Sequence, residues 1–452
     1  MEFHMSDMLS DLTSQLIDAA RKAGADAADA IAMRGTSVSI DVRKGALEHA
    51  ERSEGTDIGL RVMVGQRSAN VSASDTSADT IATLAERAVA MAREAPEDPY
   101  IGLAEPDQLA VNPDVEVLEL FDPTDEPTPE ALQSDALAAE DAALSVSGVT
   151  QVSSSSGSYG EHVVHLAASN GFAGGYRRTS RGVSCVAIAG EGTGMERDYD
   201  SDVRTFQSDL RAAEDIGRTA GERAVERLGA QKPKTGQFPV LYDERISSSL
   251  IGHLLSAANG SSIARGSSWL KDRLGEQVLP AELSIIEDPH RPRVAGSRPF
   301  DAEGLPTRRR VIVDKGCLTG WTLDLATGRK LGMPSTGNAA RGTSSGPSPA
   351  TWNIELTQGP KSRAELMAEM GTGLLVTSMI GSTINPTTGD YSRGASGFWI
   401  EDGQIAYPVN ECTIAGNLND MLRNLTAAND ARGWLSRVVP SLLVEGMTLA
   451  GS

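Results

Sequence analysis

Cysteine, histidine and aromatic residues are scarce in this sequence, which has 3 cysteines, 6 histidines and 4% Phe, Trp and Tyr among 452 residues. Cys185, Cys317 and Cys412 are far apart, so none forms the close pair that a cysteine-based zinc or redox motif requires. This usage argues against a disulfide-stabilised secreted protein and favours a reducing cytoplasm. The sequence also lacks an apolar run long enough for a membrane span and a signal-peptide pattern near its start.

Positive charge is also in short supply, because 41 Lys and Arg residues face 61 Asp and Glu residues and leave a formal net charge of −20. Such a surface repels phosphate backbones and anionic lipid headgroups. We therefore expect neither nucleic acid nor a membrane surface as a partner. The remaining composition, 40% apolar and 23% charged, is typical of a globular protein. The length is too great for one ordinary core and predicts two or three domains.

The chain is predicted to have an α+β fold, with an N-terminal domain over residues 6–228. Apolar residues recur at helical spacing in residues 6–24, and Ser77 can cap a helix that extends to Glu94. Four short strands are expected between these helices, at residues 28–33, 37–43, 47–52 and 58–64. Together they predict an antiparallel sheet with flanking helices.

A segment rich in Pro, Asp and Glu near residues 95–129 marks a subdivision of this domain. Helices are predicted beyond it at residues 130–145 and 208–228. The strands expected there, which we assign to a second sheet, are residues 148–156, 161–169 and 182–190.

A polar linker at residues 229–237 precedes the predicted C-terminal domain, residues 236–452. Asp243 can cap a helix over residues 244–258, with Gly260 as its C-terminal stop. Hairpins are expected at residues 308–323 and at residues 397–409, where Asp402 and Gly403 form a favoured two-residue turn. Few helices are expected after Leu274, so we predict a mostly antiparallel β domain.

Three stretches resemble a known family. Residues 384–417 read INPTTGDYSRGASGFWIEDGQIAYPVNECTIAGN, residues 331–341 read LGMPSTGNAAR, and a predicted hairpin contains Gly-Cys-Leu-Thr-Gly-Trp. In this order they resemble the TldD/PmbA family, and the GDYSRGASGFW run is similar to its PmbA (TldE) branch. The resemblance implies a zinc metallopeptidase built as a hollow heterodimer. In that pair a TldD-like subunit holds the zinc and the substrates are unfolded or peptide-like chains.

The family's zinc motif, His-Glu-x-x-x-His, is degenerate in this sequence. The corresponding helix, residues 244–258, has Ser248 and Ser249 in place of the first His and the Glu, and only His253 remains. A serine hydroxyl is a poor zinc ligand, and it cannot act as a general base near neutral pH. The cysteine that the resemblance implies as third ligand near the C-terminus is missing from residues 429–452. We therefore expect no catalytic residue and no metal in this chain, and zinc in a TldD-like partner.

His253 lies beside the apolar stripe of its predicted helix, and we interpret it as a packed histidine. His162 and His165 are three apart on a predicted strand, so their side chains should face opposite sides and serve surface or structural roles. The run Gly342-Thr-Ser-Ser-Gly346 matches G-x-S-x-G, but Pro347 and Pro349 follow it where a nucleophile elbow needs a helix. We interpret this run as a loop.

The segment with the strongest resemblance supplies candidates for lining a substrate channel or an assembly surface. An equally compatible interpretation is that they position a buried loop, and the sequence leaves both open. These candidates are Asp390, Tyr391, Ser392, Arg393, Phe398 and Trp399.

Three functions follow from the sequence. The leading hypothesis is a non-catalytic subunit that pairs with a TldD-like catalytic subunit, or forms a homodimer when that partner is missing, and that contacts unfolded peptide or protein substrates. The second is a hydrolase with a site that the motifs do not reveal. The third is a homodimeric binding or scaffold protein with no proteolytic role.

Overall fold

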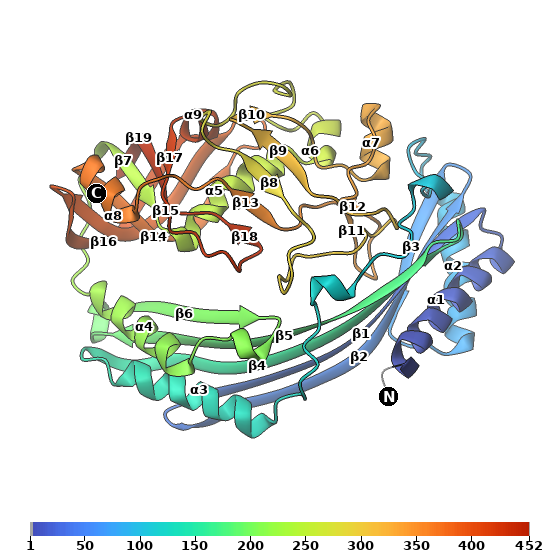
Figure 1. Ribbon diagram of the computed structural model, residues 1–452, viewed down its shortest axis with the longest axis horizontal. Coiled ribbons are helices and arrows are strands. Elements are labelled where there is room, and N and C mark those ends of the chain that lie inside the picture. Colours follow the sequence, from blue (N-terminus) through green and yellow to red (C-terminus); the bar gives the residue numbers. More distant parts are fainter. Residues whose placement is uncertain (1–2, 452) are drawn as a thin grey trace.

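The computed structural model describes residues 3–451, which form two halves facing each other (Figure 1). The N-terminal half is one six-stranded antiparallel sheet with the order β3-β2-β1-β4-β5-β6. Its strands are β1 (Ala27–Arg43), β2 (Ala46–Val64), β3 (Arg67–Ala73), β4 (Val149–Ala168), β5 (Ala173–Ala189) and β6 (Glu196–Arg204). The predicted second sheet is wrong, because β4 pairs directly with β1 from Asp29↔Ala168 to Val42↔Ser155.

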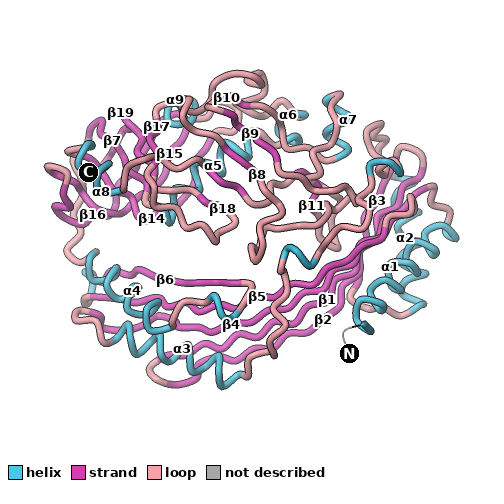
Figure 2. The backbone as a smooth tube through the Cα atoms, in the orientation of Figure 1, coloured by secondary structure: helices cyan, strands magenta, loops and turns pink. Residues whose placement is uncertain are grey.

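Four of the strands are far longer than predicted (Figure 2). The polar run at residues 53–57 was expected to turn, but it continues β2 opposite residues 33–37 of β1. Residues 34–36, which separate the predicted strands 28–33 and 37–43, likewise stay extended in β1. Long strands form here because neighbours on the sheet supply the hydrogen bonds that a polar segment would otherwise take from water.

Four helices cover one face of this curved sheet, and the C-terminal half lies toward the other face (Figure 1). They are α1 (Phe3–Ala23), α2 (Ala78–Glu94), α3 (Pro129–Leu144) and α4 (Ala213–Glu226). Ala28, Ala30 and Ala32 of β1 pack under α1 and α2. Val38 and Ile40, on the same face of β1, pack under α3. Ser77 caps α2 as predicted, since its hydroxyl accepts from the Thr80 N–H.

The C-terminal half contains the remaining described strands and five further α-helices. Sheet order is β16-β15-β14-β7-β19-β17 in one sheet and β10-β9-β8-β13-β18 in a second, and β11 pairs with β12. The first sheet consists of β7 (Gly236–Tyr242), β14 (Gly373–Ile384), β15 (Asp390–Glu401), β16 (Gln404–Asn417), β17 (Leu425–Ala427) and β19 (Leu442–Ala450). A further pairing of β16 with β19 closes five of these strands into a ring.

The other strands are β8 (Ile285–Glu287), β9 (Arg310–Asp314), β10 (Cys317–Leu318), β11 (Ala339–Ala340), β12 (Ser348–Pro349), β13 (Ile354–Leu356) and β18 (Arg437–Val438). The helices are α5 (Glu244–Ala257), α6 (Gly260–Ala264), α7 (Leu325–Leu331), α8 (Arg363–Met370) and α9 (Leu418–Arg423). Most pairs are antiparallel, and β7–β14 and β13–β18 are parallel. The predicted α+β class, with a β-rich C-terminal half, is confirmed.

Helix α5 begins after Asp243 as predicted, because the Asp243 carboxylate accepts from the Arg245 N–H. Gly260 does not stop it but starts α6, and an added Cβ there would lie 2.6 Å from Leu323 Cδ2. Leu250, Ile251 and Leu254 of α5 share one core with residues of both C-terminal sheets. Within residues 3–451, no helix combines the length and apolar character needed to cross a membrane.

Candidate functional site

Helix α5 carries the three positions of the degenerate motif on one side. Ser248, Ser249 and His253 are half-buried, whereas Leu250 and Leu254 are buried in the core. Ser249 uses its hydroxyl to donate to the Ile246 carbonyl at 2.7 Å, which is the common internal bond of a helical serine. This side of α5 therefore remains available for contacts from other elements.

Strand β15 supplies those contacts. The rings of His253 and Tyr391 meet edge-on, with centroids 5.9 Å apart and an angle of 70° between their planes. The Tyr391 hydroxyl lies 3.4 Å from the Tyr242 hydroxyl. Arg393 shares the side of β15 on which Tyr391 lies, since the two are separated by one residue. The structure thus brings together His253, Tyr391 and Arg393, which the sequence placed in two separate motifs.

The charge around His253 disfavours a cation. Burial lowers the pKa of the His253 imidazole, and the positive charge of Arg393 lowers it further. A second guanidinium, that of Arg437, lies 3.0 Å from the position that a Cβ on Gly252 would occupy. Arg437 was missed by the sequence analysis because it follows α5 by almost two hundred positions and no motif contains it.

These residues do not fit a zinc ion. A zinc site needs about three nitrogen, sulfur or carboxylate ligands, whereas α5 offers one imidazole and two serine hydroxyls beside two arginines. No group of three or more His, Cys, Asp and Glu residues with metal-binding geometry exists in the described part of the chain. The His253 Nε2 atom is buried and has no hydrogen-bond partner within residues 3–451.

The other candidates on β15 divide between surface and core. Asp390 is exposed and accepts hydrogen bonds from the Thr388 hydroxyl at 2.6 Å and from Asn417 Nδ2 at 3.0 Å, so it fixes the β14–β15 loop. Ser392 is half-buried on the same side of the strand. Phe398 and Trp399 are buried in two different core clusters. A core position explains their size without a role in binding.

His162 and His165 point to opposite faces of the N-terminal sheet, as their spacing on one strand requires. His165 is buried toward α1, where its Nδ1 lies 2.9 Å from the Thr13 hydroxyl. His162 lies on the other face, in the wall of a cavity. The loop that carries the G-x-S-x-G run packs against β2, since a Cβ on Gly59 would lie 2.2 Å from the Thr343 carbonyl oxygen.

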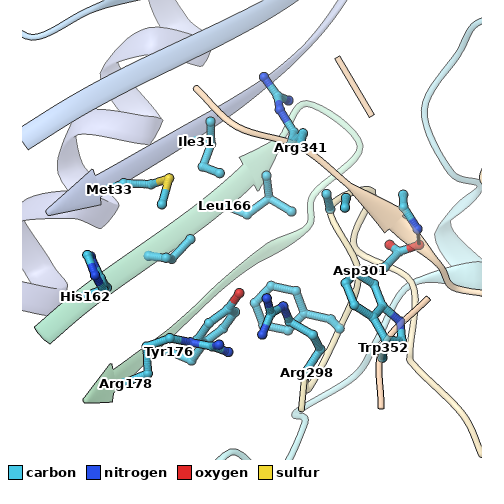
Figure 3. A pocket seen from close by; sticks show the side chains of 15 residues that line it. Ile31, Met33, His162, Leu166, Tyr176, Arg178, Arg298, Asp301, Arg341 and Trp352 are labelled. Atoms are coloured by element: carbon cyan, nitrogen blue, oxygen red, sulfur yellow. Dashed lines mark hydrogen bonds between the residues drawn. The ribbon is translucent and has the colours of Figure 1, made fainter. Parts of the chain in front are cut away.

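This cavity, of about 300 Å³, lies between the two halves of the chain (Figure 3). One wall is the sheet face formed by β1, β4 and β5. The opposite wall comes from residues 298–302, 339–341 and 352 of the C-terminal half. We call it the inter-half cavity; its lining residues are Ile31, Met33, His162, Val164, Leu166, Tyr176, Arg178, Arg298, Phe300, Asp301, Ala302, Ala339, Ala340, Arg341 and Trp352.

Comparison with known proteins identifies the family. Three family models match consecutive parts of the chain: the PmbA/TldA metallopeptidase domain 1 at residues 28–92, the central domain at residues 122–228 and the C-terminal domain at residues 235–451. The chain belongs to the PmbA/TldD metallopeptidase family. The resemblance found in the sequence is confirmed.

Two relatives in the PmbA/TldD family match nearly the whole chain. Metalloprotease PmbA of Escherichia coli O157:H7 is 37% identical over 94% of this chain and 92% of its own. The Metalloprotease PmbA homolog of Haemophilus influenzae is 36% identical over 98% of this chain and 96% of its own. The solved structure of TldE from Thermococcus kodakarensis has the same fold, with a TM-score of 0.83 at 21% identity, and the match covers 97% of this chain and 100% of that one. The chain is thus PmbA-like in sequence and shares its fold with TldE.

Sequence reasoning found the α5 and β15 positions through this family's motifs, and it missed the inter-half cavity. Arg178 and Arg298, which lie in opposite walls of that cavity, are separated by more than a hundred positions and belong to no motif. The alternation of Tyr176 and Arg178 on β5 was a usable signal, because it places both side chains on one face.

Proposed function

We propose that this chain is the non-catalytic, TldE-type subunit of a two-chain zinc metallopeptidase that acts on unfolded or peptide-like substrates. A TldD-like partner holds the zinc in this proposal, and both chains act in the cytoplasm. The observation that carries the proposal is the chemistry of α5, where Ser248 and Ser249 replace a ligand and a base. The remaining His253 lies against Tyr391 and near a guanidinium, in surroundings suited to a neutral, packed ring.

In this proposal the TldE-type subunit completes a chamber and holds the substrate peptide while the TldD-like subunit hydrolyses it. The division into domains at residues 6–228 and 236–452 would set the two walls of that chamber. Asp390, Ser392 and Arg393 are the residues proposed to contact substrate or partner, because they are exposed or half-buried. Tyr391, Phe398 and Trp399 are proposed to support them from the core.

Assembly with a second chain is supported by apolar side chains that this chain leaves exposed. Ile380, on the outer part of β14, is 78% exposed, Val203 on β6 is 61% exposed, and Ile405 on β16 is 52% exposed. Large aliphatic side chains at such exposure are stabilised when a partner covers them.

The test is co-expression with the TldD-like protein of the same source. We expect the two chains to co-purify, the mixture to hydrolyse an unfolded peptide substrate, and this chain alone to show no turnover. Elemental analysis should find stoichiometric zinc in the partner and not in this chain. Zinc retained at one ion per chain and lost in His253→Ala, or chelator-sensitive hydrolysis by this chain alone, would contradict the proposal.

The degenerate motif offers a second test. Replacing both serines, Ser248→His with Ser249→Glu, should not create a peptidase, because no third ligand is restored. A double variant that binds zinc and cleaves peptides without a partner would show that the remaining residues suffice. The double variant Ser248→Ala with Ser249→Ala is the matched control, and it should support the partner's activity as the unchanged chain does.

A further inference from the structure

We propose that the inter-half cavity binds the C-terminal residue of a peptide, with the free carboxylate between Arg178 and Arg298 and an apolar side chain against the sheet. This inference deepens the proposed function, on which it rests, by naming the part of the substrate that the chain recognises. The occupant is therefore an apolar monocarboxylate supplied by a peptide chain.

The first observation is a pair of arginines that share the same two carbonyl oxygens. Arg178 donates to the Ala295 carbonyl at 2.7 Å and to the Ser297 carbonyl at 3.0 Å. Arg298 donates to the same carbonyls at 3.3 and 2.9 Å. Figure 3 shows the two guanidinium groups near each other in the cavity. Since each guanidinium has five N–H donors, both keep donors for a further acceptor.

The second observation is that these two charges have no counter-ion. Neither Arg178 nor Arg298 forms an ion pair with any carboxylate in the chain from residue 3 to residue 451, although most other buried arginines do. Burial lowers the pKa of the Arg178 guanidinium to about 10, and Arg298 adds to the effect. Two like charges at partly buried positions are stabilised when an anion lies between them, and a planar carboxylate matches the guanidinium fork.

The third observation is the apolar floor beside this charge. Ile31 and Met33 of β1 and Leu166 of β4 alternate onto the cavity face. The Phe300 ring packs edge-on against Tyr176, with centroids 5.7 Å apart. A pocket with an apolar floor and a few convergent polar groups is typical of a small-ligand site, and 300 Å³ is at the lower end of the size range for such sites.

One acidic residue in the wall limits the charge of the ligand. Asp301 lines the cavity, and its carboxylate accepts backbone N–H groups of Glu303 and Leu305 at 2.9 Å and of Ala339 at 3.0 Å. Its negative charge opposes a polyanion such as a nucleotide, as does the net charge of −20. A single carboxylate with an apolar body remains the best match to two arginines and this floor.

The test is a titration of the purified chain, without any partner, with the peptide acetyl-Ala-Ala-Leu as the free acid and as the C-terminal amide. We expect the acid to bind about tenfold or more tightly than the amide, since charged hydrogen bonds are lost in the amide. Arg298→Gln should abolish this preference. It should still fold, because Arg178 continues to hold the carbonyls of Ala295 and Ser297. Arg178→Lys should weaken the preference because it keeps the charge and loses the fork.

The matched control is Arg309→Gln, which removes an exposed arginine outside the cavity and should keep the preference unchanged. Equal binding of acid and amide, or a preference that survives Arg298→Gln, would overturn the proposal. Tighter binding of octanoate than of the peptide acid would also overturn the proposal, because the carboxylate in the cavity would then come from a free fatty acid and not from a peptide. Failure of the chain to pair with a TldD-like protein would contradict the proposed function and leave this binding result unaffected.

Discussion

The Arg341 guanidinium donates a hydrogen bond to the Asp29 carboxylate, and the two residues belong to opposite halves of the chain. The Arg341 side chain has no exposed surface, and that of Asp29 is 4% exposed. Arg61 binds the same carboxylate through its Nε at 2.7 Å. Burial raises the pKa of the Asp29 carboxyl, but the two arginines outweigh it and hold the pKa below its ordinary value. One buried carboxylate thus serves two cations from different halves.

Asp29→Asn should destabilise the fold by about 3–5 kcal/mol, because it leaves both arginines buried without a counter-charge. Since the folded-state pKa of Asp29 is depressed, its contribution is present at neutral pH. The contribution is lost as pH falls below about 4 and through the folded-state value. Denaturant unfolding at pH 7 measures the first effect, and unfolding at a series of pH values from 4 downward measures the second. Asp18→Asn, at an exposed ion pair, is the control, and a Asp29→Asn variant as stable as this control would refute the assigned role.

Glu303→Gln should change how stability depends on pH. Burial raises the pKa of the Glu303 carboxyl well above its ordinary value, and the neighbouring Asp301 adds to the shift. The folded state therefore holds a proton that the unfolded chain loses above about pH 4.3, so the unchanged protein loses this stability as pH rises. The variant cannot titrate, and its stability relative to the unchanged protein should increase from pH 4 to pH 7. Glu282→Gln, at an exposed position, should show a constant difference.

His253→Asn should make the protein less sensitive to acid. The folded-state pKa of His253 lies below its ordinary value, so protonation opposes folding as pH falls through the unfolded value of about 6.5. The variant should have a lower free energy of unfolding than the unchanged protein at pH 7, and this difference should be smaller at pH 5. For His49→Asn, at an exposed residue, the difference should be the same at both pH values.

His253→Ala tests the chemistry of the same residue. In complex with the TldD-like protein it should keep most of the peptide hydrolysis activity. Abolished turnover, with normal folding and association, would mean that His253 takes part in the reaction.

Trp399→Ala and Asp390→Asn should separate the two kinds of position on β15. Trp399 has no exposed surface and packs edge-on against Phe238 with centroids 4.9 Å apart, so truncation should cost about 3–5 kcal/mol of folding stability. Asp390 is exposed, and its amide variant should leave the unfolding midpoint nearly unchanged. Any loss of peptidase support by Asp390→Asn would then come from the β14–β15 loop. Equal destabilisation by both variants would contradict this division.

The sequence predicted the local features of this molecule better than it predicted the contacts between distant segments. Capping by Ser77 and Asp243 and the turn at Asp402 and Gly403 involve residues a few positions apart, and all three are present. The length of β1 and β2 depends on partners that lie elsewhere in the chain, so a polar run such as residues 53–57 could not reveal it.

The site shows the same division between local and distant information. Ser248, Ser249 and His253 follow from a motif on one helix, and the sequence was enough to single them out. The approach of Arg393 and Arg437 to that helix, and of Arg178 to Arg298, arises from tertiary packing of segments that share no pattern. Periodicity reports the face of an element on which a side chain lies, and it does not report which element covers that face.

The pairing of β1 with β4 has a consequence for biosynthesis. Asp29 lies opposite Ala168 on the sheet, so a ribosome must deliver well over a hundred further residues before β1 gains its second neighbour. During that interval the nascent chain presents one open edge of β1 with its backbone donors and acceptors unpaired. Slow, non-local pairing of this kind leaves that edge open to pairing with other chains until β4 has been made.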